Sequence, residues 1–331
     1  MRASVLVVGG AGYIGSHTVK HLGKLGYDLT TFDNLSTGHR DAVTHGGFVE
    51  GDVRDEEALD ALFANHSFQV VVHFAAFAYV GESVVNPRKY FDNNIVGTLR
   101  LLDAMLDHGV KKLVFSSTCA TYGVPETTPI TEEAPQRPIN PYGRSKLMVE
   151  QILRDYAPAY DLDSFALRYF NAAGADRDGV LRERHDPETH LIPLVLREAA
   201  RVLRDGDPKQ TPLEIFGRDY PTRDGTCIRD YIHVEDLASA HAAAIARLLG
   251  GARGFEACNL GTEHGLSVLE VIDEARRVTG ANFESRDAPR RAGDPPELIG
   301  SAQKARDLLG WVPVASDAHT IVDSTWRSFP R

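Results

Sequence analysis

The stretch Val5-Leu-Val-Val-Gly-Gly-Ala-Gly-Tyr-Ile-Gly15 predicts how this chain begins to fold. Its first four residues form the short apolar run that is typical of a strand buried on both faces. Glycines then recur as G-x-x-G-x-x-G before an amphipathic stretch. Glycines at a strand-to-helix turn let the backbone turn tightly and approach a pyrophosphate at the helix N-terminus. We therefore expect a dinucleotide site at Gly9, Gly12, Tyr13, Ile14 and Gly15.

Asp33 indicates which dinucleotide this turn receives. It lies 18 residues after Gly15 and ends the predicted strand 29–32, where a carboxylate can accept hydrogen bonds from the adenosine ribose hydroxyls. A carboxylate repels the 2′-phosphate of NADP, so the prediction is NAD, held also by Asn34. The glycine spacing differs from the common G-x-G-x-x-G, and both segments could instead be plain turns.

Further cofactor contacts are expected where two later strands end. Asp52-Val53 follows the predicted strand 48–50, at a place where the adenine edge could be met. Phe74-Ala75-Ala76 ends the predicted strand 70–74, and the small residues there would let a cofactor lie across the sheet. We include both segments in the predicted NAD site.

The order of the segments predicts the fold class. Short apolar runs alternate with amphipathic stretches up to residue 171, which is the pattern of βαβ units around a parallel sheet. Strands are expected at 5–8, 29–32, 48–50, 70–74, 113–116 and 164–167, and helices at 14–25, 56–64, 88–106 and 142–156. A charged loop over 174–188 then breaks the rhythm, before helices at 193–203, 234–249 and 268–279 and strands at 213–216 and 228–233.

This pattern predicts an α/β protein with two intimate parts. Residues 1–172 are expected to form a Rossmann-like, doubly wound parallel sheet that binds NAD. Residues 173–331 are expected to form a smaller, discontinuous C-terminal substrate domain, from which segments around 225–262 return to the first domain. A chain of 331 residues is ample for such a core.

Composition narrows the classes of partner. The chain carries 36 Lys and Arg against 46 Asp and Glu, without a basic run, which argues against a nucleic-acid or anionic-membrane surface. Cys119, Cys227 and Cys258 are far apart and lack metal-ligand spacing, so we expect no metal and a reduced, cytoplasmic protein. No apolar run is long enough for a membrane span.

Tyr142 and Lys146 are the candidate chemical groups. They follow Asn140-Pro141, a helix start with an N-cap and a first-turn proline, and they lie on one helical face. A pair with this spacing is usually a surface pair. In a dry pocket, Lys146 and an oxidised nicotinamide could together favour the Tyr142 phenolate, which requires about 4 kcal/mol to reach neutral pH. Ser116-Ser117-Thr118 ends the predicted fifth strand, where such sheets bind ligands.

These motifs, in this order, resemble the extended short-chain dehydrogenase/reductase superfamily and, within it, the UDP-glucose 4-epimerase family. The likeness runs over nearly the whole chain, beyond the glycine motif: segments 31–35, 80–83, 90–99, 141–146, 168–171, 229–234 and Arg291-x-Gly-Asp294. The last four together are far more specific than a dinucleotide fingerprint. The resemblance implies reversible 4-epimerisation of UDP-galactose and UDP-glucose with a permanently held NAD.

The resemblance also implies roles for individual residues. Tyr142 would take the proton of the sugar 4-hydroxyl while NAD accepts the C4 hydride, and the hydride would return to the other face of a 4-keto sugar after it rotates. Thr118 occupies the relay position, and Lys146 would hold the nicotinamide ribose and tune Tyr142. Asn94 matches a residue near the cofactor and the relay. The remaining cofactor contacts are expected at Asn93, Ser116, Tyr142, Lys146 and Tyr169.

On the substrate side, the resemblance implies a UDP-sugar partner. Its expected contacts are Thr118, Tyr142, Asn171, Leu191, Phe216, Arg229, Tyr231, Arg291 and Asp294. Guanidinium groups suit a pyrophosphate, and aromatic and leucine side chains suit a uracil face. The resemblance further suggests a homodimer formed through the helices near 88–106 and 142–156.

The chain departs from the family pattern at several positions. Leu298, at the position associated with sugar-pocket size, is smaller than the Tyr of some members, so an N-acetylated hexose stays open beside galactose, glucose and a pentose. Ala78 stands where some members place a Lys near the cofactor, and His190 stands where many have Asn.

Two other readings compete with an epimerase. Nucleotide-sugar 4,6-dehydratases carry Asp-Glu directly after the relay Thr, whereas Cys119-Ala120 stand here and cannot supply that acid/base pair. A decarboxylating uronic-acid enzyme is similarly disfavoured. A non-catalytic NAD-binding protein on the same fold is the other alternative, against which the intact Tyr142, Lys146 and Thr118 argue.

Overall fold

A seven-stranded parallel sheet is the centre of the molecule. The structure is a computed structural model that describes residues 2–207, 212–291 and 294–329. The strands lie in the order β11-β6-β5-β4-β1-β2-β3. Their bounds are β1 (Ser4–Val8), β2 (Asp28–Asp33), β3 (Gly47–Glu50), β4 (Val70–His73), β5 (Lys112–Thr118), β6 (Asp163–Tyr169) and β11 (Phe255–Leu260). All six strands predicted in the first half are present.

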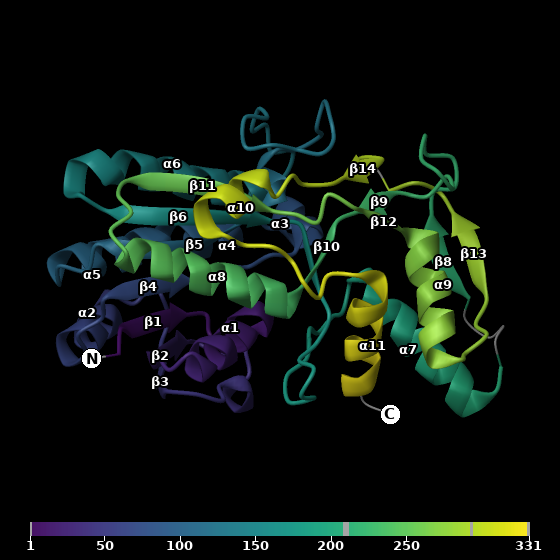
Figure 1. The fold of residues 1–331 in the computed structure, drawn as a ribbon, viewed down its shortest axis with the longest axis horizontal. Coiled ribbons are helices and arrows are strands. Elements are labelled where there is room, and N and C mark those ends of the chain that lie inside the picture. Colours follow the sequence, from purple (N-terminus) through teal and green to yellow (C-terminus); the bar gives the residue numbers. More distant parts are fainter. Residues whose placement is uncertain (1, 208–211, 292–293, 330–331) are drawn as a thin grey trace.

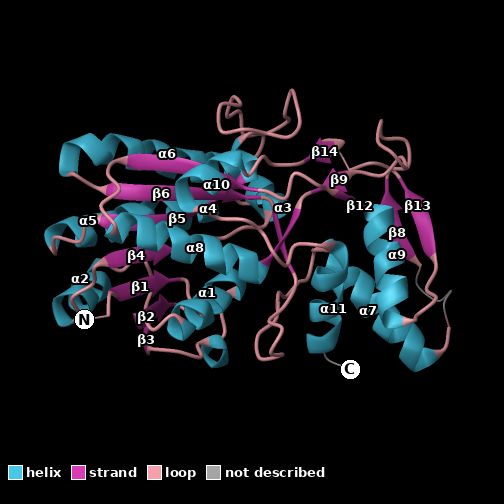
Figure 2. Cartoon of the chain, viewed as in Figure 1, coloured by secondary structure: helices cyan, strands magenta, loops and turns pink. Residues whose placement is uncertain are grey.

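Helices cover both faces of this sheet (Figures 1 and 2). On one face, Val19, Leu22 and Ile245 pack on β1 from α1 (Tyr13–Lys24) and α8 (Val234–Leu249). The opposite face is covered by α2 (Glu56–Asn65), α5 (Gly97–Asp107) and α6 (Pro141–Tyr160). The α/β, doubly wound prediction is therefore confirmed. Among the described residues, no helix has both the length and the apolar composition that crossing a membrane requires.

The predicted helix 88–106 is in fact three segments. After α3 (Val80–Val85), the chain forms α4 (Pro87–Phe91), one π-helical turn η2 (Asp92–Val96) and then α5. Within η2, the Asn94 amide bonds both the N–H and the carbonyl of Phe77, at 2.9 and 3.0 Å. Widened turns of this kind often occur at functional sites. The apolar spacing of residues 88–106 does not indicate this turn.

The C-terminal part forms a smaller body beside the sheet (Figure 1). Its core combines α7 (Leu191–Asp205) and α9 (Val268–Thr279) with α11 (Ala318–Ser328). The remaining elements are η1 (Arg40–Ala42), η3 (Cys119–Thr121), β7 (Asn171–Ala173), β8 (Leu213–Phe216), β12 (Leu266–Ser267), β13 (Ser285–Ala288), β14 (Glu297–Leu298) and α10 (Gln303–Leu309).

The single strand predicted at 228–233 is two strands in different sheets. β9 (Ile228–Arg229) lies between β12 and β14, whereas β10 (Tyr231–His233) pairs with β7. Asp230 separates them. Its buried carboxylate accepts hydrogen bonds from the backbone of Thr262 and Gly300, at 3.0 Å each to Oδ2. These bonds draw distant loops to the point where the chain changes sheet.

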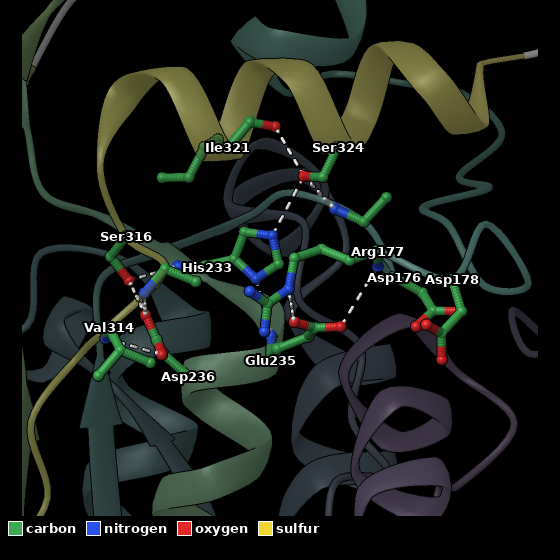
Figure 3. Close-up of polar contacts among 12 residues, drawn as sticks. Asp176, Arg177, Asp178, His233, Glu235, Asp236, Val314, Ser316, Ile321 and Ser324 are labelled. Atoms are coloured by element: carbon green, nitrogen blue, oxygen red, sulfur yellow. Dashed lines mark hydrogen bonds and ion pairs between the residues drawn. The ribbon is translucent and has the colours of Figure 1, made fainter.

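His233 at the end of β10 and Asp236 in the first turn of α8 tie the C-terminal segment to the rest of the chain (Figure 3). The His233 ring hydrogen-bonds Ser324 of α11 at 3.1 Å, and Ser324 Oγ also accepts from the Ala175 N–H. Asp236, buried in the first turn of α8, accepts from the residues that lead into α11: Val314 N, Ala315 N and Ser316 Oγ. The two parts of the chain therefore meet in a continuous polar network.

Candidate functional site

The glycine turn between β1 and α1 is shaped by its neighbours. Gly9 has a φ of +80°, and a Cβ atom there would lie 2.4 Å from Ala75 N. A Cβ on Gly15 would lie 2.2 Å from Gly9 O. Gly12 differs, because a Cβ there would meet only Gly9 O, at 3.5 Å. Gly9 and Gly15 are therefore required by packing, whereas Gly12 borders open space.

The helix end at this turn is suited to an anion. Gly12 is the N-cap of α1 and provides no side-chain cap, and the first turn, which begins with Tyr13 and Ile14, contains no acidic residue. The free N–H groups and the helix dipole therefore face outward uncompensated. The turn also lies between the carboxyl ends of β1 and β4, where the strand order reverses and such sheets bind nucleotides.

Asp33 lies at the end of β2 beside this turn. One carboxylate oxygen accepts the Ala11 N–H at 2.9 Å and the other accepts the Leu35 N–H at 2.8 Å. Burial raises the pKa of Asp33, and these backbone hydrogen bonds oppose the shift. Each oxygen keeps further acceptor capacity, so the carboxylate can receive the two hydroxyls of a ribose.

Asn34 and Asp52 contact each other rather than standing free. Asn34 Nδ2 donates to Asp52 Oδ2 at 2.8 Å, and Arg54 holds the same carboxylate through Nε and Nη2. Hydrogen bonds from Arg54 lower the pKa of Asp52, although burial acts against them. Arg54 is a residue that the sequence reasoning missed. Val53 is buried, and the absent Cβ of Gly97 makes room for it.

The segment after β4 forms the other wall of the crevice. The Phe74 and Ala75 N–H groups donate to Val8 O. The ring centres of Phe74 and His241 lie 4.6 Å apart. Ala76 follows in the same loop. Nearby, the Asn94 side chain accepts from Asn93 Nδ2 at 3.0 Å and donates to Ser145 Oγ at 3.1 Å. The asparagine pair of η2 therefore links this wall to α6.

Tyr142 lies in the first turn of α6, which starts where the sequence predicts. Asn140 is the N-cap and accepts the Gly143 N–H at 2.8 Å. Tyr142 is 9% exposed, and Thr118, at the end of β5, is 6% exposed. Burial raises the pKa of Tyr142 and Tyr169 adds to this, while a hydrogen bond with Thr118 opposes both. The structure therefore brings Tyr142 and Thr118 together in a buried site, with burial favouring the neutral phenol.

Lys146 is buried one turn further along α6. Its Nζ donates to Ser116 O at 2.8 Å, and Ser116 Oγ lies 2.5 Å from the Tyr169 hydroxyl. Burial lowers the pKa of Lys146 to about 7, although the Glu150 charge raises it. The pair is therefore no surface pair. It consists of two buried groups at the carboxyl edge of the sheet, where a negative charge arriving nearby would favour the ammonium form of Lys146.

A buried ion pair beneath these groups was missed by the sequence reasoning. Glu150, the next residue on this face of α6, contacts Arg168 of β6 at 2.6 Å and accepts from Ser117 Oγ of β5 at 2.5 Å. Arg168 also donates to the Tyr122 hydroxyl, which bonds Asn259. Glu150 and Arg168 are 1% and 2% exposed. The signal available in the sequence was the four-residue spacing of Tyr142, Lys146 and Glu150.

The residues predicted on the substrate side fall into three groups. Arg229 Nη2 and Asp294 Oδ1 form an ion pair at 2.7 Å, so these two predicted substrate contacts bind each other in this structure. The Arg291 guanidinium lies 4.2 Å from the Phe216 ring centre, and residues 292 and 293 of that motif lie outside the described range. Asn171 and Tyr231 are register partners in β7 and β10. Leu191 begins α7 and packs on the core that α7, α9 and α11 form.

The charged loop 174–190 folds back over the glycine turn. Tyr13 Oη donates to Gly174 O at 2.5 Å, and the His39 ring contacts Arg184 O at 3.3 Å. A small cavity between the two segments is lined by Gly12, Tyr13, His39 and His185, among others. Sequence reasoning identified this loop but not its position.

The residues present fit a bound NAD. Gly12 leaves the space that a pyrophosphate needs, the uncapped start of α1 suits its charge, and Asp33 suits a ribose diol. Tyr142 and Lys146 lie at the same edge of the sheet, from α6.

The chain is similar over nearly its whole length to known proteins. The sequence profile described as the NAD dependent epimerase/dehydratase family matches residues 5–261. A UDP-glucose 4-epimerase from Lacticaseibacillus casei is 50% identical over 325 residues, covering 98% of this chain and 96% of the relative. The crystal structure of UDP-glucose 4-epimerase from Brucella ovis in complex with NAD is 51% identical with a TM-score of 0.92, covering 98% and 97%. That of the Stenotrophomonas maltophila enzyme with NAD and formylated UDP-arabinopyranose is 40% identical with a TM-score of 0.93, covering 99% and 98%.

Two glycine substitutions should separate packing from cofactor binding. Gly15→Ala places a methyl group against the backbone of Gly9, and we expect a loss of about 3 kcal/mol in unfolding free energy. Gly12→Ala should cost under about 1 kcal/mol but release NAD, because its methyl group occupies the open space. Urea unfolding and the NAD content of purified protein measure the two effects. Full NAD retention by Gly12→Ala would place the pyrophosphate elsewhere.

Proposed function

The chain belongs to the NAD dependent epimerase/dehydratase family, and from that premise we propose that it is an NAD-dependent 4-epimerase that interconverts UDP-galactose and UDP-glucose. One observation carries the proposal: Tyr142, Lys146 and Thr118 are buried together at the edge of the sheet that also carries an open, uncapped glycine turn. Relatives that match over nearly their full length are UDP-glucose 4-epimerases.

Tyr142 is the proposed acid and base. NAD, when bound, supplies the chemistry of accepting a hydride from the sugar carbon and returning it. Tyr142 removes the proton of the 4-hydroxyl and later restores it, with Thr118 Oγ1 bonding the reacting oxygen and relaying the proton. The hydrogen bond by which Thr118 opposes the raised pKa of Tyr142 supports this pairing.

Lys146 is proposed to position the nicotinamide ribose and to favour the phenolate of Tyr142. Its Nζ is fixed on Ser116 O at 2.8 Å, so the ammonium is held at the end of β5 and within reach of a ribose hydroxyl. A pKa near 7 lets it carry a proton at neutral pH when a phenolate forms beside it. The proposed NAD contacts remain Gly9, Gly12, Tyr13, Ile14, Gly15, Asp33, Asn34, Asp52, Val53, Phe74, Ala75, Ala76, Asn93, Ser116 and Tyr169.

The two parts of the chain are proposed to bind different ligands, NAD and the UDP-sugar. Residues 1–172, with segments around 225–262, hold NAD, and the packing of α8 on α1 and of β11 on β6 supports that division. Residues 173–331, together with side chains of the first part, hold the UDP-sugar. From the first part we propose Thr118, Tyr142 and Asn171, and from residues 173–331 we propose Leu191, Phe216, Arg229, Tyr231, Arg291 and Asp294. Arg291 over Phe216 supports a site for a uracil face next to phosphate charge.

Tyr142→Phe tests the mechanism. This variant keeps the ring but loses the hydroxyl, so turnover of UDP-galactose should fall by about 10²–10⁴-fold while the protein keeps its NAD and its melting temperature. Tyr156→Phe, near the C-terminal end of α6, is the matched control and should retain activity. Undiminished turnover by Tyr142→Phe would reject the proposal. The proposal also fails if the wild-type protein binds NAD but turns over no UDP-sugar, so that the substitution changes nothing.

The sugar is the part of the proposal that a substrate panel decides. Leu298 is half-buried beside Tyr122 and Phe170, and it is smaller than a tyrosine. We expect UDP-galactose to be converted fastest, without added NAD. Each alternative predicts a different order: an N-acetylhexosamine enzyme favours UDP-N-acetylglucosamine, and a pentose enzyme favours UDP-xylose or UDP-arabinose.

We also propose a cytoplasmic homodimer formed through α5 and α6. Val96, the last residue of η2 before α5, and Met148 of α6 are exposed apolar side chains, at 40% and 41%. The separated free cysteines fit a reducing compartment. Sedimentation velocity should give about twice the chain mass of 36.3 kDa. A monomer at micromolar concentration would contradict the dimer and leave the chemistry untouched.

A further inference from the structure

Two histidines and two glutamates converge in the loop between β7 and α7. The Nδ1 atoms of His185 and His190 each lie 2.8 Å from the same oxygen, Glu183 Oε1. His190 Nδ1 also lies 3.0 Å from Glu188 Oε1. One possible ligand atom from each of the four side chains falls within 4.8 Å of all the others. The proposed epimerase chemistry uses none of them.

The two carboxylates of this cluster are largely withdrawn from water, whereas His190 is exposed. The side chains of Glu183 and Glu188 are 6% and 12% exposed. Among the described residues, no Lys or Arg ion pair reaches either carboxylate, because Arg184 pairs with Asp41 and Arg182 donates to Ser328 O. Two carboxylates withdrawn from water need a compensating positive charge close by. The imidazoles are the groups that face them.

The donor set also restricts which cation fits. Imidazole nitrogen with carboxylate oxygen suits Zn²⁺ and its first-row neighbours, whereas Mg²⁺ and Ca²⁺ prefer oxygen alone. Bonds of about 2.0–2.2 Å in a tetrahedral zinc site separate neighbouring ligand atoms by about 3.4 Å. The observed spacings of 2.8 to 4.8 Å bracket that value. We propose that Glu183, His185, Glu188 and His190 bind one divalent transition-metal ion of the Zn²⁺ class.

The surroundings point to a structural role for the metal. Glu188 Oε1 is oriented by the Thr189 and His190 N–H groups at 2.7 and 2.8 Å, as the ligands of an ordered site commonly are. Four protein ligands leave no open position for a substrate. The ring of His185 is flanked edge-on by Tyr13 at 6.1 Å and Tyr79 at 5.9 Å. The metal therefore fastens the loop over the glycine turn and over the segment after β4.

Metal titration of the whole protein tests the proposal. After EDTA treatment and gel filtration, we expect calorimetry and elemental analysis to give one Zn²⁺ per chain, with a raised melting temperature and no such effect of Mg²⁺. His185→Gln/His190→Gln should weaken Zn²⁺ binding by more than about 100-fold. The control His264→Gln/His319→Gln removes two exposed imidazoles elsewhere and should bind as the wild type does.

Two further measurements keep the result interpretable if the double variant folds poorly. Co²⁺ bound to wild-type protein should show the intense visible spectrum of a four-coordinate ion, and Glu183→Gln should abolish it. Trypsin cleavage after Arg182 and Arg184 should slow on Zn²⁺ addition in wild type only. Absence of a stoichiometric site in wild type, or equal Zn²⁺ binding by both double variants, overturns the proposal. Neither outcome bears on epimerisation, which is assayed separately.

Discussion

The buried contact between Glu150 and Arg168 is the constraint on which the chemical site depends. It joins α6, which carries Tyr142 and Lys146, to β6, and through Ser117 it also reaches β5, which ends at Thr118. Leaving one such charge unpaired inside a protein costs about 3–5 kcal/mol, so the helix cannot slide or rotate without a large penalty. A pair of this kind adds little net stability compared with apolar residues. Its effect here is to fix the distance between a helix face and two strand ends.

Most of the sheet was predictable because its central strands are buried on both faces. Six short segments rich in apolar residues, including the partly exposed edge strand β3, predict six of its seven strands, and the helices between them follow from apolar spacing. β11 has a mixed sequence, Phe-Glu-Ala-Cys-Asn-Leu, and only its place within the returning segment was anticipated. The two-residue strands β9, β12 and β14 exist because of tertiary partners, and short polar segments of that kind have no periodicity to read. The π turn η2 was not predicted for a similar reason, because the hydrogen bonds of the Asn94 side chain to Phe77 are tertiary contacts.

The candidate site was also predictable only where local sequence determines the geometry. The glycine turn, Asp33 and the start of α6 rest on backbone rules, because glycine, a strand-end carboxylate and Asn-Pro each specify a local geometry, and these features are found in the structure. Pairings between distant side chains could not be read. Arg229 with Asp294 and Arg54 with Asp52 bind each other, although the sequence reasoning treated Arg229, Asp294 and Asp52 as separate contacts and omitted Arg54. The pKa of Tyr142 illustrates the difference: the expected stabilisation of the phenolate comes from charges, while burial of the free protein raises that pKa.

The late return of the chain to its first sheet constrains how the molecule can be made. β11, which pairs with β6, spans Phe255–Leu260, and α8, which covers β1, ends at Leu249. A ribosome must therefore translate beyond residue 255 before the edge of β6 can be paired, although β6 itself ends at Tyr169. Until then the nascent chain exposes an unpaired strand edge and apolar side chains, the surfaces that chaperones bind and that lead to aggregation. The contacts at Asp236 and His233 form later still, because their partners Ala315 and Ser324 lie just before α11 and within it.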